Sequence, residues 1–248
     1  MSGYIFAIGG GNNLDTSIFK KMIDVSKNKK VLLITDASTY AFTKHEKKTK
    51  KYFNKFNDIS ISSIKISDVK SNRELLSKIN SNGIIYFTGG YQSNLLKEIN
   101  KFNQRYNIEL RSIFKEYLLK GGIIGGTSAG ASILGRLMPT GFNSGIRNNN
   151  YYLGKKKIGK NIQKVEYSLD LLPYIIDQHF SEKKRHDRGI GMAIDNKMKL
   201  IGIDENTAFY QKYNSNNIYK LGRNKITIYD GRNAKFKSKD NKLYITNI

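Results

Sequence analysis

The feature that most constrains the fold of this 248-residue chain is a series of short apolar runs that alternate with amphipathic segments. Five runs are bounded by glycine or polar clusters, as buried parallel strands are: residues 4–11, 30–38, 59–66, 83–90 and 121–130. Helical spacing lies between them, at 16–27, 44–56, 72–80 and 108–122. The alternation predicts an α/β fold with a mostly parallel sheet and helices on both faces.

The pattern changes after residue 135, where an irregular segment precedes several apolar runs with hairpin-like turns. This part of the chain is expected to be rich in strands. The sequence contains no obvious linker or internal repeat, so we expect residues 1–248 to form one domain.

Composition narrows the function classes. No run approaches the roughly 18 apolar residues of a membrane helix, and the N-terminal residues lack the pattern of a secretory signal, so a soluble cytoplasmic protein is expected. The chain has no cysteine, which excludes disulfides, thiolate metal sites and a cysteine nucleophile. Neither a metal nor a cofactor is expected.

The formal net charge of +23 raises the question of a polyanionic partner. The lysines are spread among asparagine-, isoleucine- and tyrosine-rich stretches, and no recognised nucleic-acid module accompanies them. We therefore expect weak, salt-sensitive adsorption to polyanions rather than specific nucleic-acid binding.

The residues Gly126-Thr127-Ser128-Ala129-Gly130 fit the pattern G-x-S-x-G, between an apolar strand and a segment that can begin a helix. This context is typical of a nucleophile elbow, in which small residues on either side of the serine let strand and helix pass closely. Two other strand-end loops, residues 9–13 and 88–94, are rich in glycine and polar residues. All three loops should converge on one crevice at the carboxyl edge of the sheet.

A nucleophilic serine needs a base within hydrogen-bond reach, and the chain has three histidines. His45 lies in a lysine-rich helical stretch and His186 in a charged run, so both are expected at the surface. His179 ends an apolar strand-like run and should emerge beside the crevice.

Four carboxylates could orient the imidazole of His179, and their spacing does not choose among them. Asp204 and Glu205 follow another apolar strand, where alternation places their side chains on opposite faces. Asp177 and Asp187 are rivals close to the histidine in sequence.

Four ordered segments, "FTGGYQSNLL", "GTSAGAS", "LLPYIIDQHFSEKKRHDRG" and "GIDENTAF", resemble the serine peptidase family S51, which contains cyanophycinase and peptidase E. The resemblance covers nearly the whole chain and implies a fold similar to class I glutamine amidotransferases. It implies Ser128 as the nucleophile, His179 as the base and Glu205 as the orienting acid. Gly90 and Ala129 would then donate backbone N–H groups to the oxyanion.

The resemblance also implies a substrate site and a substrate class. Its residues would be Gln92, Asp177, Gln178, Arg185 and Arg188, with the arginines as clamps for carboxylates. The substrate would be a peptide with an aspartyl bond: the β-Asp-Arg polymer cyanophycin, or an α-aspartyl or isoaspartyl dipeptide. A homodimer is implied as well.

Two departures from the family pattern concern specificity. Tyr91 replaces the acidic residue that often precedes the glutamine, and Lys183 stands where cyanophycinases tend to carry arginine. Related amidotransferases use a cysteine at the elbow, so a glutaminase is disfavoured here. Three other hypotheses are a serine amidase or esterase, a binding protein without activity, and a basic polyanion-binding protein.

Overall fold

The computed structural model describes residues 2–38, 42–140, 151–153, 155–158, 163–239 and 242–248. Its central sheet has seven strands in the order β13-β12-β1-β5-β4-β2-β3. The first five strands of the chain are mutually parallel: β1 (Tyr4–Ile8), β2 (Lys30–Ile34), β3 (Ser60–Ile64), β4 (Ile84–Phe87) and β5 (Ile123–Thr127). Two antiparallel strands, β12 (Thr207–Lys212) and β13 (Tyr219–Gly222), extend the sheet beyond β1.

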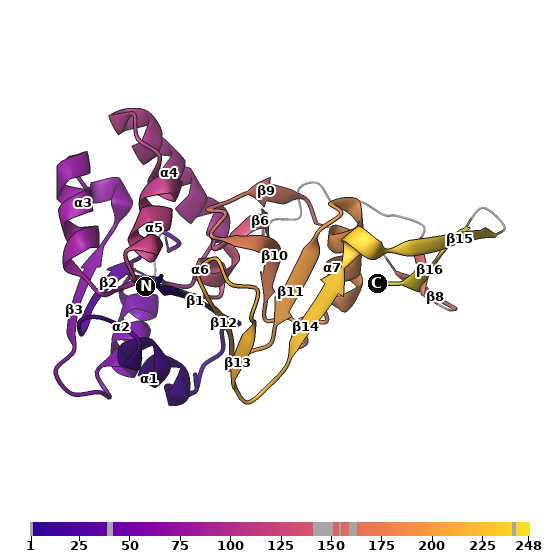
Figure 1. The fold of residues 1–248 in the computed structure, drawn as a ribbon, viewed down its shortest axis with the longest axis horizontal. Coiled ribbons are helices and arrows are strands. Elements are labelled where there is room, and N and C mark those ends of the chain that lie inside the picture. Colours follow the sequence, from indigo (N-terminus) through magenta and orange to yellow (C-terminus); the bar gives the residue numbers. More distant parts are fainter. Residues whose placement is uncertain (1, 39–41, 141–150, 154, 159–162, 240–241) are drawn as a thin grey trace.

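Helices cover both faces of this sheet (Figure 1). On one face, Val31 and Leu33 share an apolar cluster with the helices α1 (Thr16–Asp24) and α2 (Phe42–Phe53). On the other face, Leu32 and Ile34 share a second cluster with α3 (Asn72–Ser81), α4 (Gln92–Tyr106) and α5 (Leu110–Leu119). Because successive strand residues point to opposite faces, β2 buries apolar side chains on both, and the predicted α/β architecture is confirmed.

The C-terminal part is rich in strands, as the sequence predicts. A five-stranded sheet has the order β14-β11-β10-β6-β9. Its strands are β6 (Gly135–Pro139), β9 (Val165–Tyr167), β10 (Leu172–Gln178), β11 (Lys199–Ile203) and β14 (Ile226–Asp230). The helix α7 (His186–Asp195) packs against it through Met192 and Ala193, which share a cluster with Phe180 and Leu200.

A small four-stranded sheet lies at the C-terminal end of the molecule (Figure 1). It joins β7 (Tyr151–Leu153), β8 (Lys156–Ile158), β15 (Lys235–Lys239) and β16 (Lys242–Asn247). The remaining helical elements are short: η1 (Ile66–Asp68), α6 (Ala129–Ser132) and η2 (Gly231–Asn233). Within the described ranges, no helix has the length and apolarity needed to cross a bilayer.

The carboxyl ends of the two larger sheets meet at one place, and backbone hydrogen bonds join them. The loop after β1 accepts hydrogen bonds from the loops that follow β10 and β11. His179 N–H donates to the Gly9 carbonyl at 2.9 Å, and Asn206 N–H donates to the Gly10 carbonyl at 2.9 Å. The three strand-end loops predicted to converge do so here, because Gly10, Gly89 and Thr127 line the same cavity.

Candidate active site

Ser128 occupies a sharp turn between β5 and α6. Its backbone has φ 54° and ψ −116°, a conformation that costs a non-glycine residue of order 1–3 kcal/mol. The glycines on either side permit close contacts. A Cβ atom at Gly126 would lie 2.1 Å from the carbonyl oxygen of Gly130, and a Cβ at Gly130 would lie 2.1 Å from that of Phe87. The turn is therefore sharp and brings β5 and α6 into close contact, as the G-x-S-x-G pattern predicts.

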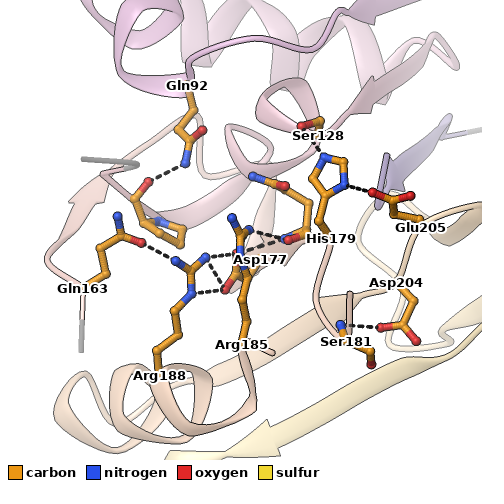
Figure 2. Close-up of polar contacts among 12 residues, drawn as sticks. Gln92, Ser128, Gln163, Asp177, His179, Ser181, Arg185, Arg188, Asp204 and Glu205 are labelled. Carbon is orange, nitrogen blue, oxygen red and sulfur yellow. Dashed lines mark hydrogen bonds and ion pairs between the residues drawn. The ribbon is translucent and has the colours of Figure 1, made fainter. Parts of the chain in front are cut away.

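His179 lies between Ser128 and Glu205 (Figure 2). Ser128 Oγ is 2.9 Å from His179 Nε2, and Glu205 Oε1 is 2.5 Å from His179 Nδ1. The ring packs directly on the loop after β1, where a Cβ atom at Gly10 would lie 2.3 Å from His179 Cε1. This chain of contacts is the arrangement in which a serine hydroxyl can be deprotonated and the imidazole held in one orientation.

The loop between β11 and β12 fixes Glu205. The backbone N–H of Glu205 donates to Glu182 Oε1 at 3.1 Å, and the backbone carbonyl of Glu205 accepts from Asn224 Nδ2 at 2.8 Å. Hydrogen bonds at both backbone groups hold the carboxylate toward the imidazole.

The three rival carboxylates are engaged elsewhere. Asp204 accepts the N–H of Ser181 at 3.0 Å, on the opposite side of the loop from Glu205 (Figure 2). Asp187 pairs with Lys156 at 2.8 Å. Asp177 is fully buried and is bound to two arginines. Among the four candidates, Glu205 is thus the carboxylate that the structure places at His179 Nδ1.

Burial lowers the pKa of His179 below its usual value of 6.5. The hydrogen bond that His179 Nδ1–H donates to Glu205 opposes this effect, while the positive charge of Lys183 adds to it. The imidazole is therefore neutral at neutral pH, which is the state that can accept a proton from serine.

Two backbone N–H groups are available beside Ser128. Within the described part of the chain, neither Gly90 nor Ala129 donates a hydrogen bond through its N–H. Gly90 has φ 144°, and a Cβ there would lie 2.2 Å from the carbonyl oxygen of Ala37, so this position requires glycine. Unused donors beside a nucleophile are what an oxyanion hole needs.

A cavity of about 150 Å³, here called the arginine cavity, lies on one side of Ser128. Its cationic lining residues are Lys183, Arg185 and Arg188. Asp177 accepts from Arg185 Nη1 at 2.9 Å and from Arg188 Nη2 at 2.6 Å. One carboxylate faces two guanidinium groups, which leaves an excess of positive charge at the cavity wall.

The structure corrects the expectation that Asp177 binds substrate. Its side chain is fully buried beneath the two arginines, so it orients them instead of meeting a ligand (Figure 2). Gln92 and Gln178 line the arginine cavity. Gln92 Nε2 donates to the Pro139 carbonyl at 2.8 Å, and Gln178 Oε1 is buried with no partner among the described residues.

A second cavity of about 180 Å³, here called the histidine cavity, also borders Ser128 and includes His179 in its lining. His45 also lines it, so the expectation of a surface role for His45 is wrong. Helical spacing in the sequence indicates this inward position of His45. His45, Thr49 and Tyr52 recur at i, i+4 and i+7, which is one face of a helix, and all three line this cavity.

His186 is likewise not a solvated surface residue. It lies edge-on to Phe180, with ring centroids 4.8 Å apart, and its Nδ1 is 3.0 Å from the hydroxyl of Tyr229. His186 is the first residue of α7, and these contacts join the start of the helix to Phe180 and β14. Among the described residues, no group of three acidic or histidine side chains has the arrangement of a metal site.

Comparison with protein families gives one match that covers most of the chain. The profile of peptidase family S51 matches residues 5–218. A cyanophycinase from Geminocystis herdmanii (strain PCC 6308) is 28% identical over 190 residues, which are 73% of this chain and 64% of that protein. A cyanophycinase from Synechococcus elongatus is 27% identical over 194 residues, which are 75% of this chain and 55% of that protein. The match thus spans between 55% and 64% of these relatives.

Solved structures agree with the fold. A peptidase from an acI-B1 actinobacterium superposes with a TM-score of 0.68 at 20% identity, covering 93% of this chain and 92% of that chain. A protein assigned as peptidase E from Listeria monocytogenes EGD-e superposes with a TM-score of 0.60 at 18% identity, covering 90% and 100% of the respective chains. These similarities concern the fold, and they agree with the expected class I glutamine amidotransferase-like architecture.

Proposed function

This chain belongs to peptidase family S51, and on that premise we propose that it is a serine-type peptidase whose triad is Ser128, His179 and Glu205. The observation that carries the proposal is the pair of contacts at the imidazole, 2.9 Å to Ser128 Oγ and 2.5 Å to Glu205 Oε1. The order of the three residues along the chain is no obstacle, since a triad is defined by geometry and role.

The reaction proceeds in two halves. His179 Nε2 takes the hydroxyl proton as Ser128 Oγ attacks the carbonyl carbon of the scissile amide. The C–N bond then breaks, and His179 passes that proton to the leaving nitrogen, which departs as an amine. Water hydrolyses the remaining ester, again with His179 taking a proton from the nucleophile and returning it to Ser128 Oγ.

Glu205 keeps the imidazole oriented and stabilises the imidazolium that forms during each half-reaction. The N–H groups of Gly90 and Ala129 receive the negative charge that develops on the carbonyl oxygen. Donors of this kind each lower a barrier by about 3 kcal/mol.

The acyl part of the substrate is an aspartyl residue, and a free carboxylate of that residue, or of the arginine joined to it in cyanophycin, enters the arginine cavity. Support comes from the excess positive charge of Lys183, Arg185 and Arg188 beside the nucleophile and from the similarity to cyanophycinases. Cleavage of cyanophycin is the first form of this proposal. Hydrolysis of α-aspartyl or isoaspartyl dipeptides is the second form. The choice between them depends in part on Lys183, because a lysine in place of the arginine that cyanophycinases tend to carry cannot bind a carboxylate through two parallel hydrogen bonds.

The direct test is amine release from cyanophycin, from β-Asp-Arg and from α-aspartyl dipeptides, by the wild type and by Ser128→Ala. We expect the wild type to cleave at least one aspartyl substrate and Ser128→Ala to lose at least about 10⁴-fold in kcat. A variant that kept its rate would refute Ser128 as the nucleophile. Polyanion binding without hydrolysis by either protein would instead favour the binding-protein hypothesis.

A further inference from the structure

We infer that the histidine cavity receives the leaving part of the substrate and that its cationic extension selects acidic leaving residues over basic ones. This inference rests on the proposed peptidase function and narrows its substrate class. It favours the dipeptide form of the proposed function, with substrates such as aspartyl-glutamate, over cyanophycin, in which arginine is joined to the aspartyl residue.

The two cavities that border Ser128 have different roles because only one of them is lined by His179, the group that protonates the leaving nitrogen. The leaving nitrogen must receive its proton from His179, so it departs on the side where His179 is exposed to the cavity. His179 and Glu205 line the histidine cavity, and neither lines the arginine cavity. The acyl part therefore occupies the arginine cavity, and the leaving part occupies the histidine cavity.

The histidine cavity does not end at the triad. It shares Asn12, Leu14, Lys48 and Tyr52 with an adjoining hollow of about 690 Å³ that runs along α2. The two hollows together are here called the basic trough. A leaving residue fits the inner part, and further residues of a peptide can follow into the outer part.

The basic trough carries a large excess of positive charge. Five cationic residues line it: Lys47, Lys48, Lys51, Lys55 and Arg223. The acidic lining residues are Asp15 and Glu205, and both are occupied. Asp15 accepts the N–H of Ser17 at 2.9 Å and lies 3.8 Å from Arg223, so it balances that arginine, and Glu205 holds His179. The four lysines carry the excess charge.

The lysines of the basic trough lack a carboxylate partner among the described residues, as do other lysines on this surface such as Lys70 and Lys97, but here they gather along one hollow. Lys20, Lys50, Lys101 and Lys120 each form an ion pair at 2.6 to 2.7 Å with an acid three or four residues away. In the described ranges, Lys47, Lys48, Lys51 and Lys55 form no ion pair with an acidic side chain. Like charges at i, i+4, such as Lys47 and Lys51, destabilise a helix. This cost would be offset by an anionic ligand.

Lys48 sits where the inner and outer parts join. Its Nζ donates to the Gly11 carbonyl at 2.6 Å and to Asn12 Oδ1 at 3.0 Å, which fixes the ammonium at the cavity wall. A carboxylate on the leaving residue would meet this fixed charge, whereas a guanidinium would be repelled by it. The inner part admits a group the size of one residue, which favours a peptide over a nucleic acid as the anion.

The inference is tested with dipeptides that share one acyl residue. We expect the wild-type kcat/KM for aspartyl-glutamate to exceed that for aspartyl-arginine by about tenfold, as several partly screened charge contacts would produce. The ratio should fall toward one in the double variant Lys47→Glu/Lys51→Glu. The matched control, Lys70→Glu/Lys97→Glu, changes the net charge equally at exposed residues outside the basic trough and should keep the wild-type ratio.

A binding measurement separates the peptide from other anions. Ser128→Ala protein is titrated with a fluorescent aspartyl-tetraglutamate peptide and with a labelled oligonucleotide of the same charge. We expect Lys47→Glu/Lys51→Glu, introduced into this protein, to weaken peptide binding at least fivefold, and the control pair not to. Weakening that is confined to the oligonucleotide would overturn the inference.

Failure of the inference is distinct from failure of the proposed function. If the wild type hydrolyses aspartyl peptides but shows no preference for glutamate, or keeps the preference after charge reversal, the inference alone is wrong. If it hydrolyses no aspartyl peptide, the proposed function is wrong and the leaving-group role of the basic trough is lost with it.

Discussion

The carboxylate at His179 can be assigned by comparing two substitutions that remove one charge each. Glu205→Gln keeps the shape but favours the wrong imidazole tautomer, and we expect kcat to fall by about 10³ to 10⁴-fold with little change in the melting temperature. Asp177→Asn instead leaves Arg185 and Arg188 without their buried counter-charge, and we expect a loss of stability of about 3–5 kcal/mol. Steady-state kinetics and thermal unfolding measure both effects. A larger fall in kcat for Asp177→Asn would show that the acid is misassigned.

Lys183 should control the pH at which activity is lost. Its positive charge lowers the pKa of His179, so removing that charge in Lys183→Gln raises the pKa. In the proposed mechanism activity requires neutral His179, so it should disappear as pH falls through this pKa. The acidic limb of kcat/KM should therefore lie below pH 6.5 in the wild type and move to higher pH in the variant. Lys184→Gln, one residue along, is the control that should leave the limb in place, and a downward shift in Lys183→Gln would contradict the electrostatic argument.

The turn between β5 and α6 depends on the absence of side chains at its glycines. In Gly126→Ala the new Cβ would lie 2.1 Å from the Gly130 carbonyl oxygen, so strand and helix must separate. We expect the unfolding free energy to fall by about 1–3 kcal/mol, accompanied by loss of activity. Gly89→Ala is the matched control for stability, because its Cβ would meet nothing closer than 3.5 Å. Equal melting temperatures for the two variants would show that the turn tolerates widening.

Elements with a strong pattern could be predicted from the sequence, and those without one could not. The five apolar runs became β1 to β5, since buried parallel strands leave continuous apolar sequence. The helix α4 was not predicted because its first turn coincides with the loop motif at Gln92 and no side chain caps it at Tyr91. The inward face of α2 is hidden in the sequence because lysines dominate the composition of the segment. The helical spacing of His45, Thr49 and Tyr52 is the pattern that indicates it.

Contacts between the two larger sheets determine which carboxylate lies beside His179, a choice that sequence spacing alone leaves open. Four carboxylates were candidates for His179, and the choice depends on how the loops after β10 and β11 meet the loop after β1. No local pattern encodes that meeting. The burial of Asp177 under Arg185 and Arg188 depends in the same way on the packing of α7 against β10, so the family resemblance placed it wrongly with the ligand-binding residues.

The net charge of +23 should make salt act on stability and on catalysis in opposite directions. Screening reduces repulsion among the lysines, so raising NaCl from 0.05 to about 0.5 M should raise the melting temperature by a few degrees. The same screening should weaken capture of an acidic peptide and raise its KM. Calorimetry and kinetics in matched buffers measure the two trends. A melting temperature that fell with salt would show that self-repulsion is not a significant destabilising force.

The strained backbone of Ser128 has a consequence for how this chain can change over generations. At φ 54° and ψ −116°, glycine would occupy the turn with less strain than serine. The residue that stability favours at this position is thus not the one that the proposed nucleophile requires. As long as the serine is retained, selection for hydrolysis must outweigh the gain in stability that glycine would bring. In a descendant that no longer encountered its substrate, we would expect this serine to be among the first residues replaced, by glycine.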